Sequence, residues 1–128
     1  MAYFSNVMIA VTKQDFEKIE KEQKKIPDNI LLEDIDVEHY KENNIECVFV
    51  HFGYISYNKE LEEVKLLEKS LNKLKNGYMF CRLGEEFADI DFRKRTKLPE
   101  LMKEFEFIKD VSKMLNKELK KDEEQELE

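Results

Sequence analysis

Two segments of this 128-residue chain carry apolar side chains on both alternating sets of positions. The first is YFSNVMIAVT (3–12) and the second is IECVFVHFGYISY (45–57). A strand that is buried on both faces has this pattern, because successive side chains point to opposite faces of a sheet. The chain therefore needs a sheet with at least two central strands and with cover on both faces.

Three further strands are predicted around these two. The segment 31–40 alternates charged with apolar residues, which is typical of a half-exposed edge strand, and the polar turn 41–44 follows it. Residues 78–83 and 87–92 are expected to pair as a hairpin. Gly53, inside the second central strand, indicates a bulge or a close approach of another segment.

Three helices are predicted from capping residues and apolar stripes. Thr12 is a candidate cap for a helix that ends before Pro27, with Asp15 completing a capping box. Asn58 is a candidate cap for a second helix that Gly77 is placed to end. A third helix is expected from Pro99. Its apolar line is Leu98, Leu101, Phe105, Ile108, Val111, Leu115 and Leu119.

The order of these elements is β-α-β-β-α-β, followed by a short strand and a helix. It predicts a single α+β domain over residues 1–119, with a ferredoxin-like core, an extra short strand and a C-terminal helix, and a disordered charged tail at 120–128. Two helices cover only one face of such a sheet. The C-terminal helix is the expected cover for the other face; a second copy of the chain or a target protein is the alternative.

The net charge of the chain limits the classes of partner that it is expected to bind. A net charge of -7, from 29 acidic and 22 basic residues, argues against general affinity for nucleic acid or for an anionic membrane, and it favours a basic partner protein. Cys47 and Cys81 lie in apolar runs, no secretory signal is recognised, and no apolar stretch approaches 18 residues. We therefore expect a cytoplasmic protein with reduced thiols and no membrane contact.

Acidic residues cluster in two places, and both clusters are predicted contacts for a basic groove on a partner. The predicted contacts are Glu33, Asp34, Asp36 and Glu38 in the first cluster, and Glu85, Glu86, Asp89 and Asp91 in the second. A solvated strand face explains the same residues without any ligand. A third interpretation is a metal-dependent enzyme that uses the carboxylates of Asp89 and Asp91 to bind Mg²⁺ or Ca²⁺.

The hairpin that carries the second cluster is predicted to mix acidic and apolar side chains on one face. A loop at 84–86 would place Ile90 and Phe92 on the same face as Phe80 and Tyr78. Asp89 and Asp91 would then share the other face with Cys81 and Met79. This mixture of acidic and apolar side chains suits neither solvent nor a core, so either the register differs by one residue or another segment covers the edge.

Other catalytic and binding patterns are weakly represented. Cys47 and His51 are four residues apart on a strand, roughly 13 Å, which is too far to share one zinc ion. Two histidines and three glycines offer no nucleophile–base pair and no phosphate loop. We therefore expect a protein that is not an enzyme and needs no cofactor.

A basic run directly follows the second acidic cluster. It comprises Arg93, Lys94, Arg95 and Lys97. These residues are candidates for phosphate contacts, with Tyr54 and Tyr57 as stacking platforms for bases. Pairing with the neighbouring acids is the favoured interpretation, and direct binding of nucleic acid is disfavoured.

The segments YFSNVMIAVTKQDF (3–16) and LEEVKLLEKSLNKLKNGYMFCRLGEEFADIDF (61–92) resemble a family of uncharacterised small acidic proteins encoded by phages and prophages. That family has the pattern S-N-V-x-I-A-x-T-K at its start and F-x-R-x-G-E-x-x-x-D-I later. Its middle segment is rich in tryptophan, whereas this chain has none, and the helix after Pro99 is an addition. The family supplies no catalytic residues to carry over.

The resemblance implies a setting in which small acidic phage proteins bind host proteins. It points to a non-enzymatic inhibitor of a host defence protein with a basic groove, such as a nucleic-acid-binding effector, and an anti-CRISPR protein is the leading specific expectation. A homodimeric module that binds a small molecule or nucleotide, with its pocket formed by the uncovered sheet face, is the alternative of a different class.

Overall fold

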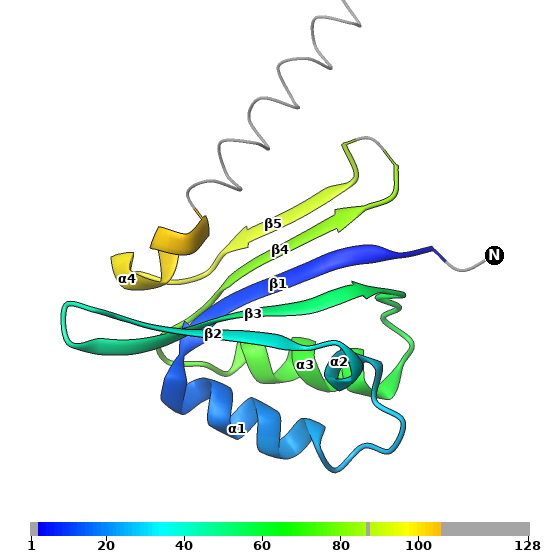
Figure 1. The fold of residues 1–128 in the computed structure, drawn as a ribbon, viewed down its shortest axis with the longest axis horizontal. Coiled ribbons are helices and arrows are strands. Elements are labelled where there is room, and N and C mark those ends of the chain that lie inside the picture. The colour runs from blue at the N-terminus through cyan, green and yellow to red at the C-terminus, as the bar shows by residue number, and fades with distance from the viewer. Residues whose placement is uncertain (1–2, 87, 106–128) are drawn as a thin grey trace, which may run out of the picture.

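Five strands form one antiparallel sheet in an α+β arrangement (Figure 1). The structure is a computed structural model that describes residues 3–86 and 88–105. The strands are β1 (Ser5–Thr12), β2 (Asp36–Glu42), β3 (Ile45–Ile55), β4 (Met79–Gly84) and β5 (Ile90–Lys94). Their order across the sheet is β2-β3-β1-β4-β5, so the two segments predicted to be central are central and β2 is an edge strand.

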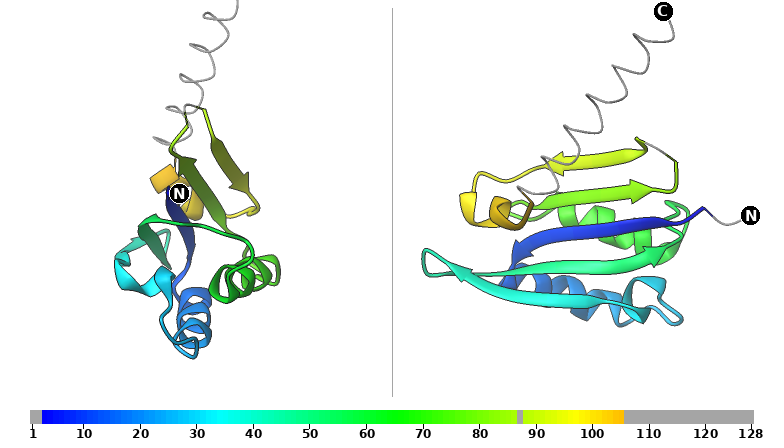
Figure 2. Two further views of the ribbon diagram at one scale, coloured as in Figure 1. Left: turned by 90° about the vertical axis from the view of Figure 1, so that its right-hand side faces the viewer. Right: turned by 45° about the horizontal axis from the view of Figure 1, so that its top comes forward.

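The helices lie on both sides of the sheet (Figure 2). They are α1 (Lys13–Gln23), α2 (Ile30–Glu33), α3 (Glu62–Asn72), α4 (Pro99–Met102) and the single 3₁₀ turn η1 (Lys103–Phe105). We call the side packed against α1, α2 and α3 the helix-covered face and the opposite side the second face. No helix within the described ranges is long and apolar enough to cross a membrane.

The helix-covered face holds the larger core. Val7, Ile9 and Val11 of β1 pack there against Phe16 and Ile19 of α1, and all five are buried. Burial of an aliphatic side chain contributes about 1.5–3 kcal/mol, so this core supplies most of the apolar stabilisation. Thr12 accepts a hydrogen bond from the Asp15 backbone N–H at 3.3 Å, which confirms Thr12 as the cap of α1.

The prediction that residues 31–40 form one strand is wrong in its first half. Residues 30–33 form α2, because the side chain of Asn29 accepts a hydrogen bond from the Leu31 N–H at 2.9 Å and Leu31 is completely buried. The strand continues to Glu42 and so includes the first two residues of the predicted turn at 41–44. The turn itself consists of Asn43 and Asn44, both with positive φ (52° and 66°), as a two-residue hairpin loop requires.

Asn58 and Gly77 do not bound α3 as predicted. Asn58 accepts a hydrogen bond from the Glu60 N–H at 2.9 Å, so it stabilises a turn before the helix rather than the helix itself. The helix ends at Asn72, and Gly77 lies in the following turn with φ of +72°. A Cβ on Gly77 would lie 1.9 Å from the carbonyl oxygen of Arg95, so close backbone approach is its structural role.

The β4–β5 hairpin has a register one residue away from the predicted one. Cys81 pairs with Phe92 and Arg82 pairs with Asp91. The loop is longer than predicted, because Ala88 adopts a left-handed conformation (φ 67°) and the Gly84 N–H donates to the Asp89 carbonyl at 2.8 Å. Phe92 therefore joins the apolar side chains of the second face, whereas Asp91 lies beside an arginine.

A one-residue bulge interrupts the pairing of β1 with β3. Val7 pairs with Gly53 and Met8 pairs with His51, which leaves Phe52 as the extra residue. Gly53 has φ of +97°, and a Cβ built on it would lie 3.2 Å from the Cβ of Asp34. Both expectations for Gly53, a bulge and a close approach, are confirmed.

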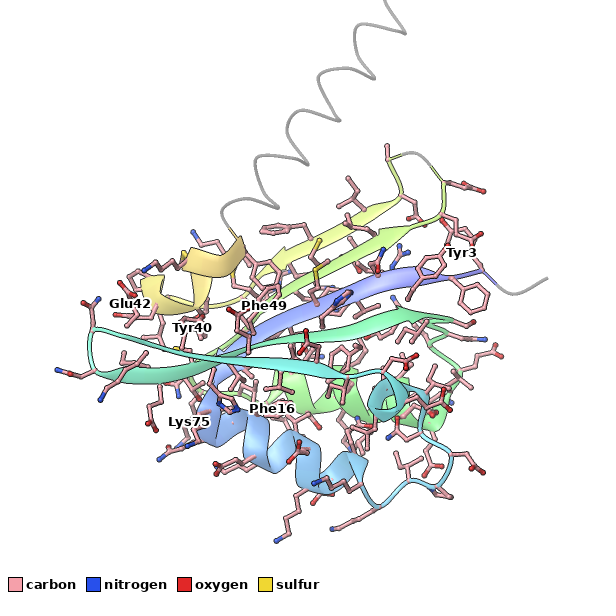
Figure 3. All side chains as sticks on the ribbon, viewed as in Figure 1. Tyr3, Phe16, Tyr40, Glu42, Phe49 and Lys75 are labelled. Atoms are coloured by element: carbon pink, nitrogen blue, oxygen red, sulfur yellow. The ribbon has the colours of Figure 1, made fainter. Side chains whose placement is uncertain are left out.

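The second face is partly covered by the segment that begins at Pro99. Leu101 and Phe105 are completely buried against it, and the Phe105 ring lies 5.2 Å from that of Phe49 and 6.2 Å from that of Phe92. The Tyr40 hydroxyl donates to the Glu100 carbonyl at 2.9 Å and ties β2 to α4 (Figure 3). The rest of the predicted apolar line, from Ile108 to Leu119, and the tail 120–128 lie outside the described residues.

Candidate partner-binding surface

The first acidic cluster follows the free edge of the sheet. Glu33 ends α2, Asp34 follows it, and Asp36 and Glu38 lie in the edge strand β2. All four side chains are exposed. Within residues 3–86 and 88–105, none of the four forms an ion pair with a lysine or arginine.

The second acidic cluster divides into two kinds of residue. Glu85 and Glu86 lie exposed in the β4–β5 loop. The Glu85 carboxylate accepts hydrogen bonds from the Tyr54 hydroxyl at 3.0 Å and from the Phe4 N–H at 3.1 Å. This loop is therefore tied to the start of β1 and the end of β3.

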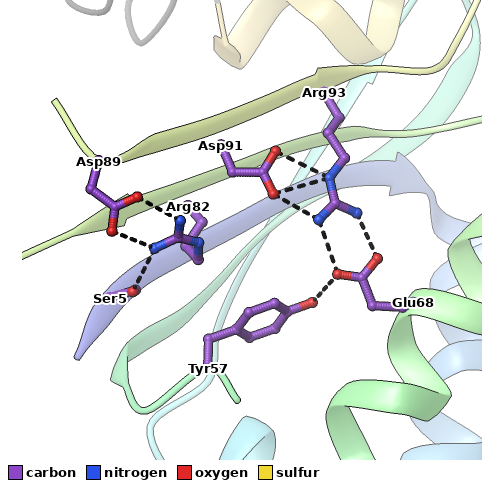
Figure 4. A network of polar contacts seen from close by, with 7 residues as sticks. All are labelled: Ser5, Tyr57, Glu68, Arg82, Asp89, Asp91 and Arg93. Atoms are coloured by element: carbon purple, nitrogen blue, oxygen red, sulfur yellow. Dashed lines mark hydrogen bonds and ion pairs between the residues drawn. The ribbon is translucent and has the colours of Figure 1, made fainter. Parts of the chain in front are cut away.

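The Asp89 carboxylate instead accepts hydrogen bonds from other residues of the chain (Figure 4). The Arg82 guanidinium donates to both of its carboxylate oxygens, at 2.8 and 3.1 Å, and also to the Ser5 hydroxyl at 3.1 Å. The Tyr3 hydroxyl donates to the same carboxylate. These hydrogen bonds, from Arg82 first and then from Tyr3, lower the pKa of Asp89 to about 2.

Asp91 belongs to a second pair around Arg93. The Arg93 guanidinium donates to Asp91 at 2.7 Å and to both oxygens of Glu68 on α3, at 2.5 and 3.1 Å. Glu68 also accepts a hydrogen bond from the Tyr57 hydroxyl at 2.9 Å (Figure 4). The hydrogen bonds from Arg93 hold the pKa of Asp91 below its usual value.

Burial and hydrogen bonding shift the pKa of Glu68 in opposite directions, whereas burial and the Glu68 carboxylate shift the pKa of Tyr57 in the same direction. Burial raises the pKa of Glu68, but the hydrogen bonds from Arg93 and Tyr57 outweigh it and the net shift is downward. The pKa of Tyr57 is raised, first by burial and then by the adjacent Glu68 carboxylate. Tyr57 therefore stays a neutral donor, and its ring lies against that of Phe80 with 5.8 Å between the centroids.

The basic run is likewise divided. Arg93 forms ion pairs with Glu68 and Asp91, whereas the other three residues are exposed: Lys94, Arg95 and Lys97. The backbone of Arg95 pairs with that of Tyr78 through two hydrogen bonds of 2.9 and 3.3 Å, which extends the β4–β5 pairing by one step. Pairing of the run with neighbouring acids is thus confirmed for Arg93.

The residue types that carry enzyme chemistry are dispersed. The described part of the chain holds no group of three His, Cys, Asp or Glu side chains placed to bind a metal ion. Cys47 and Cys81 are buried free thiols, and burial raises the pKa of the Cys81 thiol to about 11. His51 contacts the Asn6 amide oxygen at 3.3 Å, while His39 is exposed on β2.

Sequence reasoning missed an exposed aromatic pair beside the acids. Phe4 and Tyr54 are 36% and 54% exposed, and their ring centroids lie 5.4 Å apart. The two residues are far apart in the sequence, and only the pairing of β1 with β3 brings them together. No signal in the sequence marks Phe4 as the partner of Tyr54.

No protein-family model, no curated protein and no solved structure matches this chain.

Proposed function

We propose that this protein is a non-enzymatic, phage-type inhibitor that binds a basic groove of a host defence protein through its acidic surface, with an anti-CRISPR role as the most specific form. One observation carries the proposal. Glu33, Asp34, Asp36 and Glu38 stand exposed along one sheet edge and lack an ion pair within the described chain. Such a row of like charges repels itself and is relieved by a basic partner.

The contacts of this inhibitor are Glu33, Asp34, Asp36 and Glu38, joined by Glu85 and Glu86 of the loop. Asp89 and Asp91 also belonged to the expected contact set, but their carboxylates accept hydrogen bonds from Arg82 and Arg93. A partner would have to displace an arginine that already donates to each of them. These two residues are therefore assigned to the stability of the hairpin, and the basic run has no part in the contact.

We also infer a ferredoxin-like core for the domain. The strand order β2-β3-β1-β4, with α1 between β1 and β2 and α3 between β3 and β4, supports this inference. In that interpretation β5 is the extra strand, and α4 begins the C-terminal addition that covers part of the second face. The buried free thiols support a location in the reducing cytoplasm of the host cell.

A pull-down from a lysate of the native host, with identification of the captured protein, tests the proposal. The double variant Asp36→Lys/Glu38→Lys replaces two negative charges on the β2 edge by two positive ones, a change of four charge units. Its matched control is Glu17→Lys/Glu60→Lys, which makes the same change at two exposed acids elsewhere. We expect the β2 variant to slow association with the captured partner by about 10-fold or more at low salt, and the control to change it far less.

Two results would overturn the proposal. One is a captured partner whose association rate is the same for both double variants and does not depend on salt. The other is a captured partner whose contact surface has no excess of lysine and arginine.

A further inference from the structure

The second face is not covered evenly. Phe49 and Tyr40 lie under α4 and η1 at one end, whereas Tyr3 marks the opposite end, where β1 begins (Figure 3). Phe4 and Tyr54 lie at that opposite end, and together with Tyr3 they are the exposed large apolar residues of the described chain. An exposed aromatic pair loses the stabilisation that burial would give it, so its position calls for an explanation.

The bulge in β3 decides where Tyr54 points. Val50 and Phe52 both belong to the core of the helix-covered face, and unbroken alternation would place residue 54 there as well. Because Phe52 is an extra residue, Tyr54 pairs with Asn6 and lies on the second face. Ile55 then lies in the core of the helix-covered face. Glycine at position 53 permits this arrangement, because its φ of +97° is one that residues with a side chain rarely adopt.

The aromatic pair is also held in place before any partner arrives. The Tyr54 hydroxyl and the Phe4 N–H both donate to the Glu85 carboxylate, at 3.0 and 3.1 Å. The rings of Phe4 and Tyr54 lie 5.4 Å apart with 30° between their planes. More than half of the Tyr54 side chain remains open to solvent, so one ring face is available for a contact.

Acidic residues lie on both segments that border these rings. The Glu85 carboxylate accepts a hydrogen bond from the Tyr54 hydroxyl, whereas Asp34 lies near Gly53, the neighbour of Tyr54 in β3. Asp36 pairs with His51 of the same strand. A planar cation satisfies this combination best, because a guanidinium stacks on an aromatic face and also donates to carboxylates beside the ring.

We propose that Phe4 and Tyr54, with the Glu85 carboxylate beside them and the exposed acids Asp34 and Asp36 on the adjacent edge, receive an arginine side chain from a basic segment of the partner protein. The inference rests on the proposed function. It identifies Phe4 and Tyr54 as the point of contact, and we call this pair the arginine anchor. The acids attract the segment over a distance, and the rings then select arginine over lysine at contact.

The test uses two synthetic probes, octa-arginine and octa-lysine peptides, with the full-length protein. Calorimetry gives the affinities and ¹⁵N-resolved NMR maps the shifted amides. The wild-type protein should bind octa-arginine more tightly than octa-lysine, with shifts at Phe4, Tyr54 and Glu85. Tyr54→Leu should weaken octa-arginine binding by about 2- to 5-fold and reduce the arginine preference, because an exposed cation–π contact is worth about that factor.

Two controls separate the ring from the fold. Tyr54→Phe keeps the ring and should retain the arginine preference, although it loses the bond to Glu85. Tyr3→Leu removes an exposed ring whose hydroxyl bonds Asp89, outside the anchor, and should leave the preference unchanged. Phe4→Leu provides an independent variant with the same expected loss as Tyr54→Leu, and thermal unfolding of each variant verifies that it folds.

Each result has a definite meaning. Equal binding of the two peptides by the wild type, or an unchanged preference in both Tyr54→Leu and Phe4→Leu, would overturn the arginine anchor. If the anchor is overturned in this way but the Asp36→Lys/Glu38→Lys variant binds octa-arginine more weakly than the wild type, the proposed function of the acidic surface stands. Absence of any peptide binding also overturns the anchor, whereas the pull-down decides the proposed function separately.

Discussion

Arg93 lies over the ring of Phe80, with 4.2 Å between its guanidinium carbon and the ring centroid. Phe80 is completely buried in the larger core, and the Arg93 side chain is 17% exposed. One face of the guanidinium thus packs on the core, while its edges donate to Asp91 and Glu68. This single side chain joins β5, β4 and α3 at the edge of the sheet.

We expect the substitution Arg93→Met to lower the free energy of unfolding by about 2 kcal/mol. It leaves the half-buried carboxylates of Asp91 and Glu68 without a cation, and breaking a buried pair by removing one partner costs up to about 3–5 kcal/mol before partial exposure is considered. Urea unfolding followed by circular dichroism measures the loss. Arg93→Lys, which keeps the charge but not the paired geometry, should lose less. A change below about 0.5 kcal/mol in Arg93→Met would contradict the structural role.

The low pKa of Asp89 predicts a specific loss of stability in acid. Its pKa is about 2 in the folded protein and near 4 in an unfolded chain, so the native state binds fewer protons. The contribution of Asp89 is therefore fully present above pH 4 and is lost as the pH falls towards 2. In Asp89→Asn, urea unfolding between pH 5 and 2 should show a shallower decline of stability than in the wild type. Some decline should remain, because the pKa values of Asp91 and Glu68 are also lowered.

The two thiols should be unreactive in the native protein at pH 8. Cys47 and Cys81 are 1% and 0% exposed, and burial raises the pKa of both, that of Cys81 to about 11. The thiolate is the reactive species, so we expect a disulfide reagent to modify them at least about 100-fold more slowly than in denaturant. The single variants Cys47→Ala and Cys81→Ala assign each reaction. Rapid modification of one thiol without denaturant would show that α4 or β5 opens readily.

Gly77→Ala should be among the most damaging single substitutions in this chain. Its Cβ would lie 1.9 Å from a backbone oxygen of Arg95, at a φ of +72° that alanine rarely adopts. We expect a loss of at least about 3 kcal/mol or a failure to fold. Asn76→Ala, at the exposed neighbouring position, is the matched control and should change stability by less than about 0.5 kcal/mol. Comparable melting temperatures for the two variants would show that the turn rearranges at little cost.

The parts of the fold that follow from local periodicity were predictable. β1 and β3 are apolar on both alternating sets because both of their faces are buried, and the Thr12 cap needs only its own neighbours. The β4–β5 register was not predictable, since it depends on Ala88 in a left-handed conformation that its side chain does not favour. The ion pair between Arg93 and Glu68 was not predictable either. The two residues are 25 positions apart in the sequence, and only the packing of α3 beside the sheet brings them together.

The candidate site shows the same division. The sequence revealed the acids as exposed charge, and Glu33, Asp34, Asp36 and Glu38 are exposed. It could not separate them from Asp89, whose arginine partner lies seven residues away across a hairpin of unexpected register.

The bulge opposite Val7 has a further consequence for how this surface can change. Deleting Phe52 would remove the bulge and leave regular pairing of β3 with β1, with Gly53 opposite Val7 and Tyr54 still opposite Asn6 on the second face. The deletion would take one large side chain out of the core of the helix-covered face without altering any charge. The core and the aromatic pair can therefore change independently of each other along this one strand.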